Sequence, residues 1–173
     1  KGLDFPDVTL VGVLNADTAL NLPDFRSSER TFQLLTQVAG RAGRADKEGQ
    51  VLIQSYNPHH YAIEFARRQD YEGFFNHEMN LRRQLGYPPY YFTVGLTLSH
   101  KDEEFLVKKS YQELDILRSG LSDQVKILGP TPKPIARTHN LYHYQILLKY
   151  RFEDHLQETL DRMLEWTQDR ENK

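Results

Sequence analysis

Apolar and polar positions recur with different periods along the chain, and the changes of period mark its predicted elements. Residues 8–14 and 50–56 are almost continuously apolar, as expected of strands that are covered on both faces in a parallel sheet. Residues 28–43 between them have helical spacing. A strand, a helix and a strand in this order form the unit that builds parallel sheets, so the first part of the chain is predicted to be α/β.

Helical spacing returns over residues 58–86 and stops at the proline pair 88–89, because proline lacks the amide hydrogen that a helix needs. Residues 92–98 then alternate between large apolar side chains and small or polar ones, the pattern of a strand with one buried face. The rest of the chain is predicted to contain a helix over residues 102–119, a strand over 125–128, a proline-rich loop over 129–134, a strand over 143–150 and a helix over 153–167.

These elements predict three parts: an α/β part over residues 1–57, a connecting helical segment over 58–89, and an α+β domain over 90–173. The last part has the order βαββα, which is a ferredoxin-like plait without its final strand. Either that edge strand lies beyond residue 173 or the sheet closes differently.

Composition limits the classes of protein that fit. The 39% hydrophobic and 27% charged fractions are ordinary for soluble protein. No apolar run approaches the roughly 20 residues of a membrane helix, so no membrane association is predicted. The chain has no cysteine, which excludes disulfides and thiolate metal sites from it and fits a reducing, cytoplasmic setting.

The net charge of -2 does not indicate a nucleic-acid-binding surface over the whole chain, so contacts with a polyanion must come from local patches. One such patch is indicated between Asp123 and Glu153, where no other acidic residue occurs. Within this span, Lys133 and Arg137 are the candidate DNA-binding residues. The basic residues of the span are Lys126, Lys133, Arg137, Lys149 and Arg151, with His139 and His143.

Residues 37–44, with the pattern Gln-x-x-Gly-Arg-x-Gly-Arg, carry the clearest chemical signal. If the predicted helix continues through them, Gln37, Arg41 and Arg44 share one narrow stripe. Paired guanidinium groups suit a phosphate because each offers a planar fork of donors. The two glycines of the motif weaken a helix, which is consistent with the close approach of another surface. A solvent-facing arginine pair in surface ion pairs is the simpler alternative.

The motif at residues 37–44 resembles motif VI of superfamily 2 helicases, and residues 1–8 resemble the end of their motif V, in the expected order. Other segments resemble one particular family of these helicases, and together the resemblance covers nearly the whole chain. Similarity to the PriA family of primosomal replication-restart helicases is carried by residues 15–20, 23–30, 87–90, 128–132 and 144–148. The first part of the chain is thereby identified as the end of a RecA-like helicase lobe 2.

This resemblance implies an ATP-dependent helicase that uses magnesium, moves 3′ to 5′ on single-stranded DNA, and restarts replication at stalled forks. Arg41 and Arg44 would be the catalytic arginines that reach the γ-phosphate of ATP. Gln37 and Gly40 would shape the surface beside them.

The residues that match motif V would complete the implied nucleotide site. Asp4 would contact the ribose of the nucleotide or the network between the two helicase lobes. Gly2 would permit a tight backbone turn beside it. The alternative for Asp4 is an aspartate that caps a turn after a glycine.

The implied partners are forked and single-stranded DNA, the single-stranded DNA-binding protein, and primosome and helicase-loading proteins. Because the sequence opens inside a motif, we expect it to be a piece of a longer protein. It has no phosphate-binding loop and no acidic magnesium-binding motif, so we do not expect it to hydrolyse ATP by itself. The family's zinc-binding cysteines lie upstream, and no zinc is predicted here. The alternative function is a non-catalytic module that docks DNA or protein.

Three other features have both a functional and a structural interpretation. Tyr142, Tyr144 and Tyr150 could stack on bases, but alternate residues of a strand usually serve the core. The seven histidines show no helical i, i+4 pair, so surface or core positions are favoured over a metal site. The prolines of residues 130–134 suit a rigid connection better than a polyproline ligand.

Overall fold

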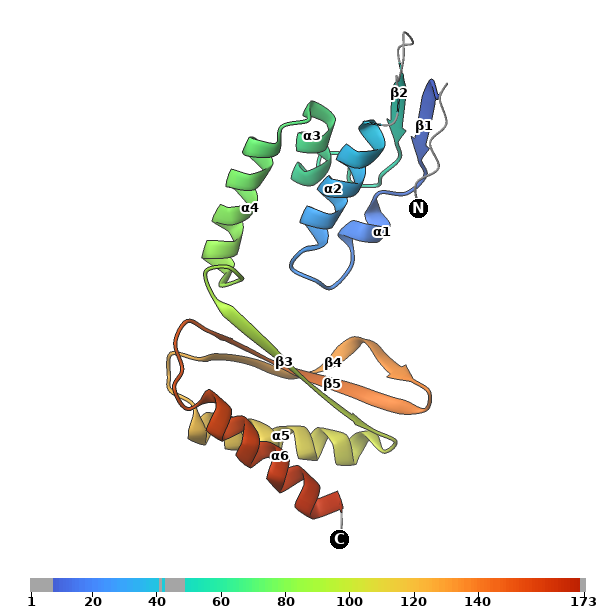
Figure 1. Ribbon diagram of the computed structural model, residues 1–173. Coiled ribbons are helices and arrows are strands. Elements are labelled where there is room, and N and C mark those ends of the chain that lie inside the picture. The colour runs from blue at the N-terminus through green and yellow to red at the C-terminus, as the bar shows by residue number, and fades with distance from the viewer. Residues whose placement is uncertain (1–7, 41, 43–48, 172–173) are drawn as a thin grey trace. The chain divides into compact units, whose positions relative to one another are not determined.

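The computed structural model describes residues 8–40, 42 and 49–171, with the backbone alone for residues 168–171. Its contacts divide the chain into two compact units, Lys1–Leu81 and Arg82–Lys173. The division falls inside the segment 58–89 that the sequence predicts to be a connection. Each unit combines helices with a sheet, which is parallel in the first and antiparallel in the second (Figure 1). None of the helices in the described part of the chain is long and apolar enough to span a bilayer.

The first unit is built on two parallel strands, β1 (Leu10–Val13) and β2 (Gln50–Ile53), which pair with Leu10 opposite Gln50. Helices α1 (Asp17–Leu20) and α2 (Ser27–Ala39) connect them. Helix α3 (Tyr61–Arg68) packs beside α2. The predicted strand, helix and parallel strand are therefore present.

Helices cover only one face of these two strands among the residues that the structure describes. Phe32 and Leu35 of α2 are buried, and Ile53 of β2 packs against their cluster. In contrast, Leu10 is 56% exposed and Leu52 is 62% exposed. The prediction that both faces are covered is thus wrong for the described residues. An apolar run shows that a strand favours burial but does not show which of its faces has a neighbour.

Helix α2 ends at Ala39 rather than at the predicted residue 43. Gly40 forms its C-cap, donating its N–H to the Thr36 oxygen at 3.1 Å, and Ala42 lies in a bend. Glycine costs about 1 kcal/mol in a helix relative to alanine, so two glycines within four residues favour an end here. Of the three side chains of the predicted stripe, Gln37 lies on the helix, and Arg41 and Arg44 lie outside the described residues.

Helix α4 (Tyr71–Leu85) follows α3 after a break at residues 69 and 70. Gln69 adopts the left-handed conformation with φ 53° and ends α3. The Asp70 side chain then accepts the N–H of Gly73 at 2.8 Å, within the first turn of α4. The helical prediction for residues 58–86 is confirmed, with two helices in place of one.

The second unit has the predicted order βαββα. Its sheet is antiparallel with the strand order β3-β5-β4, so β3 is an edge strand among the described elements. Helices α5 and α6 lie on the same face of this sheet (Figure 1). The elements are β3 (Phe92–His100), α5 (Glu103–Gly120), β4 (Lys126–Thr138), β5 (Leu141–Tyr150) and α6 (Leu156–Glu171).

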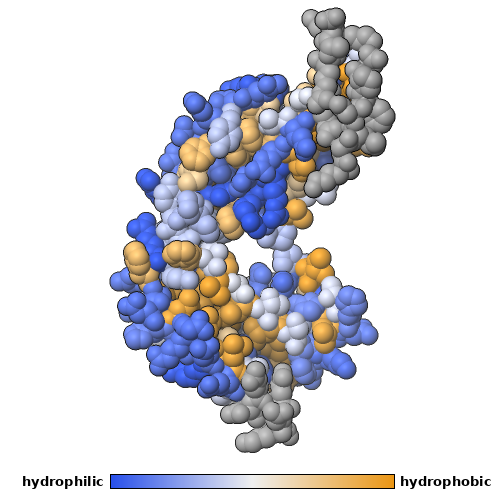
Figure 2. All heavy atoms as spheres, viewed as in Figure 1, coloured by the Kyte–Doolittle hydropathy of each residue, from blue (hydrophilic) through white to orange (hydrophobic). Residues whose placement is uncertain are grey.

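The core of the second unit lies between the sheet and these two helices. Ile146 and Leu148 of β5 are fully buried together with Leu117 of α5. Figure 2 shows apolar residues of this unit gathered between its strands and helices, with hydrophilic residues over its outer sides. Side chains alternate between the two faces of a strand, so the neighbours of the buried residues point away from the helices.

We call the side of this sheet that faces away from α5 and α6 the open face. The strand register places one set of alternating residues from each strand on it. Its members are Thr93, Gly95, Thr97 and Ser99 of β3, His143, Gln145, Leu147 and Lys149 of β5, and Lys126, Leu128 and Thr131 of β4.

Strand β4 continues through the proline-rich segment 129–134, where the sequence predicts a loop. The loop prediction is therefore wrong. Proline cannot donate to a neighbouring strand, but β4 is the outer strand of the sheet and needs partners on one side only. The pairing shifts register between Leu128 and Thr131 and again between Pro132 and Arg137. These irregularities accommodate the prolines within the strand.

Leu148 and Leu128 provide a test of which face is buried. We expect Leu148→Ala to lower the free energy of unfolding of the second unit by about 2 to 5 kcal/mol, because it leaves a cavity beneath the helices. Leu128→Ala, on the open face, should cost less than about 1 kcal/mol. Denaturant unfolding followed by the fluorescence of Trp166, the single tryptophan, measures both. Equal costs for the two variants would contradict this assignment.

Candidate functional site

The structure describes two of the six residues predicted to contact the nucleotide. Gln37 is exposed on the last turns of α2, as predicted, and Gly40 is exposed directly after the helix. Four predicted residues lie outside the described part of the chain, namely Gly2, Asp4, Arg41 and Arg44.

The two helicase-like motifs lead into neighbouring strands. Residues 1–8 precede β1 and residues 37–44 precede β2. These strands are parallel partners, and the Gln50 N–H donates to the Thr9 oxygen at 2.8 Å where they begin. The described residues that lead directly into the two strands therefore lie at the same edge of the sheet, the one formed by the amino ends of the strands. A side chain added at Gly40 would meet no atom closer than 3.8 Å, so this surface can be approached closely.

The opposite edge of this sheet is closed by Asp17 at the start of α1. Its buried carboxylate accepts the Ser55 hydroxyl and the Tyr56 N–H, both at 2.9 Å. The Tyr56 N–H is the main cause of a lowered pKa of this carboxyl, with burial acting against it. The hollow beside Asp17 is small, with a volume of about 40 Å³. Asp17 therefore links the segments that follow the two strands.

Asp17 has no sequence pattern around it that predicts this role. Its partners lie 38 and 39 positions away along the chain, and no local pattern relates them. Only the parallel pairing of β1 and β2 brings these segments together.

The two predicted DNA-binding residues lie on different sides of the second sheet. The Lys133 ammonium lies over the open face and donates to the Thr97 hydroxyl at 3.5 Å. Arg137 is exposed and lies over the ring of Tyr142 at 4.9 Å. Tyr142 pairs with His100, on the side of the sheet that the helices cover. The structure thus separates the two candidates.

Two other basic residues of the predicted span differ in whether their charged groups are exposed to a ligand. Lys149 is only 6% exposed, because its ammonium donates to the Leu85 oxygen at 3.0 Å and lies over the Tyr87 ring at 3.4 Å. Lys149 therefore stabilises the start of the second unit. Arg151 is exposed, and its guanidinium lies 4.7 Å from the centre of the Tyr91 ring. A guanidinium held on a ring keeps its donors available to a ligand.

Charge is strongly segregated between the layers of the second unit. Its three strands and the segment before them, residues 82–101 and 124–152, contain eight lysine and arginine residues and no aspartate or glutamate. All 13 acidic residues of the range 82–173 lie within residues 102–123 and 153–171, which hold the helices and adjoining turns. One of the two acid-free segments is evident in the sequence as a basic span. The sheet brings the two segments together into one layer without acidic residues.

The three tyrosines considered for base stacking are engaged within the second unit. Tyr144 donates its hydroxyl to Glu103 at 3.4 Å, and Tyr142 lies under Arg137. Tyr150 stacks on Phe92 with the ring centres 5.7 Å apart. All three belong to the side of β5 that faces the helices, which agrees with the structural interpretation of this alternation.

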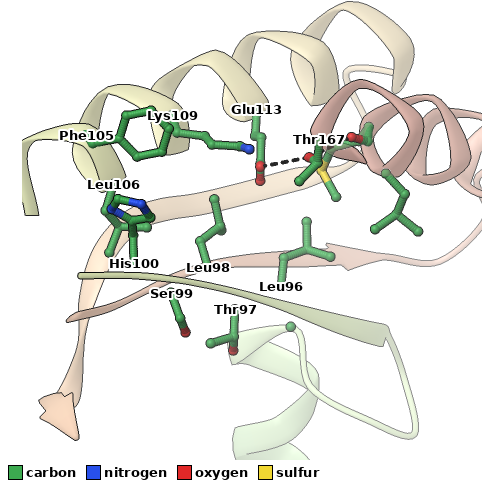
Figure 3. Close-up of a pocket in the computed structure, with 13 residues that line it drawn as sticks. Leu96, Thr97, Leu98, Ser99, His100, Phe105, Leu106, Lys109, Glu113 and Thr167 are labelled. Atoms are coloured by element: carbon green, nitrogen blue, oxygen red, sulfur yellow. Dashed lines mark hydrogen bonds between the residues drawn. The ribbon is translucent and has the colours of Figure 1, made fainter. Parts of the chain in front are cut away.

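A groove of about 350 Å³ runs between β3 and the two helices of the second unit. Figure 3 shows Leu96 and Leu98 pointing into it, while Thr97 and Ser99 point to the other side of the strand. Burial raises the pKa of Glu113 in its wall, and the Thr167 hydroxyl donates to this carboxyl group at 3.3 Å. None of the residues predicted to bind nucleotide or DNA lines this groove.

The residues that the structure describes contain no group of three or more histidine, cysteine, aspartate or glutamate side chains arranged to hold a metal ion.

Comparison with known proteins relates the chain to one family. The model of the primosomal protein N C-terminal domain matches residues 83–173. The replication restart protein PriA of Bacillus subtilis is 50% identical over 165 residues, covering 95% of this chain and 20% of that protein. The protein of the same name from Synechocystis is 45% identical over 151 residues, covering 87% of this chain and 18% of that protein. The chain thus spans about a fifth of the length of these relatives.

Asp17→Asn should destabilise the first unit in a pH-dependent manner. The folded state lowers the pKa of Asp17, so its carboxylate contributes stability above the ordinary pKa of about 3.9. This contribution is lost as the pH falls through the lowered folded value. We expect a lower unfolding temperature by circular dichroism and faster hydrogen exchange at the Tyr56 amide at pH 7, with both differences shrinking in acid. Asp115→Asn, the same change at an exposed site, should have no effect, and equal stability of both variants at pH 7 would refute this role.

Proposed function

Since the chain belongs to the family of the primosomal protein N C-terminal domain, we propose that it is part of an ATP-dependent, 3′ to 5′ DNA helicase that restarts replication at stalled forks. Proteins named replication restart protein PriA that share 34 to 50% of its residues support this role. The observation that carries the proposal is the sequence motif at residues 37–44, which begins on the helix that connects two parallel strands.

In this proposal the first unit is the end of a RecA-like lobe 2. Leu10 and Leu52 on its uncovered sheet face suit a position inside a larger sheet that is covered on both sides. The motif residues Arg41 and Arg44 neutralise charge on the γ-phosphate during its transfer. Gly2 and Asp4 act at the same edge of the sheet, because their segment leads into the neighbouring strand.

The residues of the motif that the structure describes fit an approaching triphosphate. Gln37 is exposed, and the space beside Gly40 is open. Bound ATP with magnesium would supply the phosphoryl group and neutralise part of its charge. The chain contributes the arginines of this site, and the phosphate loop and the acidic magnesium ligand would come from other parts of the longer protein.

The second unit contacts DNA in this proposal. Its acid-free strands provide the positive surface that phosphate groups require, with Lys133 on the open face and Arg137 near the tip of the β4–β5 hairpin. Forked and single-stranded DNA are the substrates. The single-stranded DNA-binding protein and the primosome and helicase-loading proteins are the partners.

The role of the arginines can be tested in the full-length protein. We expect Arg41→Ala and Arg44→Ala each to lower the rate of DNA-stimulated ATP hydrolysis by roughly 10³-fold or more, because the charge on the transferred phosphate is no longer neutralised. A phosphate-release assay with saturating single-stranded DNA measures this rate. Arg67→Ala, which removes an exposed arginine from α3, is the matched control and should hydrolyse ATP normally. Normal hydrolysis in both motif variants would refute the assignment.

DNA contact by the second unit can be tested with the 173-residue chain. We expect Lys133→Ala and Arg137→Ala each to weaken binding to a forked DNA and to reduce the slope of log affinity against log salt by about 0.9, since each contacts one phosphate. Fluorescence anisotropy over a salt series measures both quantities. Arg118→Ala, on the acid-rich helix layer, should change neither. No binding of the unaltered chain at low salt would exclude this function.

A further inference from the structure

The open face of the second sheet is an acid-free strip with cations at both ends. From Thr93 to Ser99 it extends along β3 for about 20 Å. Lys133 lies over it near Thr97, towards the hairpin end. At the other end, Arg151 lies on the ring of Tyr91, and Lys126 is exposed opposite Lys149 in the neighbouring strand.

The residues at the two ends are held in place. A side chain at Gly86 would lie within 4 Å of both Tyr91 and Lys149, so the segment before β3 packs against this end of the open face. His143 at the hairpin end contacts the Ser99 and Thr138 hydroxyl oxygens, both at 2.6 Å, through its two ring nitrogens. The rigid ends favour a ligand that needs little rearrangement of the protein.

The centre of the open face is partly apolar. Gly95, Leu147 and Leu128 form one row across the three strands, because Gly95 and Leu128 both pair with Leu147. Gly95 is exposed and has no side chain to interrupt the strip. On either side of this row the strip carries the hydroxyl groups of Thr93 and Thr97 and the amide of Gln145. These groups can donate hydrogen bonds to phosphate oxygens.

The nearest acidic residue after Arg151 does not reverse this charge pattern. Glu153 accepts the Ser122 N–H at 3.1 Å and also the Ser122 hydroxyl. The Ser122 hydroxyl is the main cause of its lowered pKa. The carboxylate of Glu153 is thus held at the turn that follows α5.

We infer that the open face binds one single strand of nucleic acid along β3. The phosphates contact Arg151 and Lys126 at one end and Lys133 at the other, and the sugars and unpaired bases contact the row of Gly95, Leu147 and Leu128. This inference rests on the proposed DNA-binding function and assigns a site and a strandedness to it.

A single strand suits this surface better than a duplex for two physical reasons. A flexible strand can follow the twist of a sheet for about 20 Å, whereas the phosphates of a stiff duplex leave such a surface after a few contacts. The apolar row can contact bases only if they are unpaired. An acidic peptide could pair with the lysine and arginine side chains, but its charged side chains would make no favourable contact with the apolar row.

Gly95 offers a test at the centre of the strip. A side chain at this position meets no atom within 4 Å, so Gly95→Glu places a carboxylate on the open face without a steric clash. Gly95→Gln is the matched control, because it has nearly the same size and no charge. The probe is a fluorescein-labelled oligothymidylate of about 16 nucleotides, titrated with the 173-residue chain at low salt.

We expect Gly95→Glu to weaken binding at least tenfold and Gly95→Gln to bind within about threefold of the unaltered chain. The double variant Lys126→Ala with Arg151→Ala should lower the salt slope by about 1.4, since each phosphate contact of a single strand contributes about 0.7. Arg118→Ala should leave the slope unchanged. A blunt duplex of the same length should bind more weakly than the oligothymidylate.

Three outcomes would overturn the inference. They are unchanged binding by Gly95→Glu, an equal loss with Gly95→Gln, and competition by polyglutamate as effective as competition by unlabelled oligothymidylate. In each of these cases the forked-DNA experiment with Lys133→Ala and Arg137→Ala still tests the proposed function separately, because it depends neither on Gly95 nor on a single-stranded probe.

Discussion

Ile146 and Leu148 are buried completely beneath α5 and α6. Their burial determines which face of the sheet the residues paired in register with them, and the neighbours of those residues, point to. Side chains alternate along a strand, so residues next to these two must face away from the helices. Residues paired across neighbouring strands lie on the same face, so the register fixes which residues of β3 and β4 face the helices. A hydrophobic contact on one side of the sheet thereby decides which polar groups meet solvent on the other.

The distribution of charge follows the same division into layers. Acidic residues occur in the helix segments of the second unit and are absent from its strands. Lysine and arginine side chains on the strands therefore meet aromatic rings and main-chain oxygens, as Arg151 meets Tyr91 and Lys149 meets the Leu85 oxygen. Those that remain exposed keep donors available to an anion. The polarity of the unit is thus a property of its layers, although its net charge is close to neutral.

In the first unit, the parallel pairing of β1 and β2 determines which segments meet at each edge of the sheet. β1 and β2 begin side by side, so the residues that lead directly into them lie at one edge of the sheet. At the other edge the same pairing places Asp17 against Ser55 and Tyr56. One edge is thereby closed by hydrogen bonds, and the other receives the segments in which nucleotide-contacting residues are proposed. The buried hydrogen bonds of Asp17 and the proposed nucleotide-contacting residues are thus at opposite edges of the sheet.

Local pattern in the sequence was sufficient for most of the order of elements, but not for the short helix α1 or for the break between α3 and α4. The apolar periods of helices and strands differ, and each is set by nearby residues. Local pattern also failed at Gly40, where a helix ends earlier than its spacing suggests, and over residues 129–134, where an outer strand tolerates prolines. The sequence motifs also indicated the family and the arginines at residues 41 and 44. Only the tertiary structure decided that Lys133 and Arg137 lie on different sides of the sheet and that Lys149 is buried. Pairing partners and covering helices come from distant parts of the chain, so these outcomes cannot be obtained from any local segment.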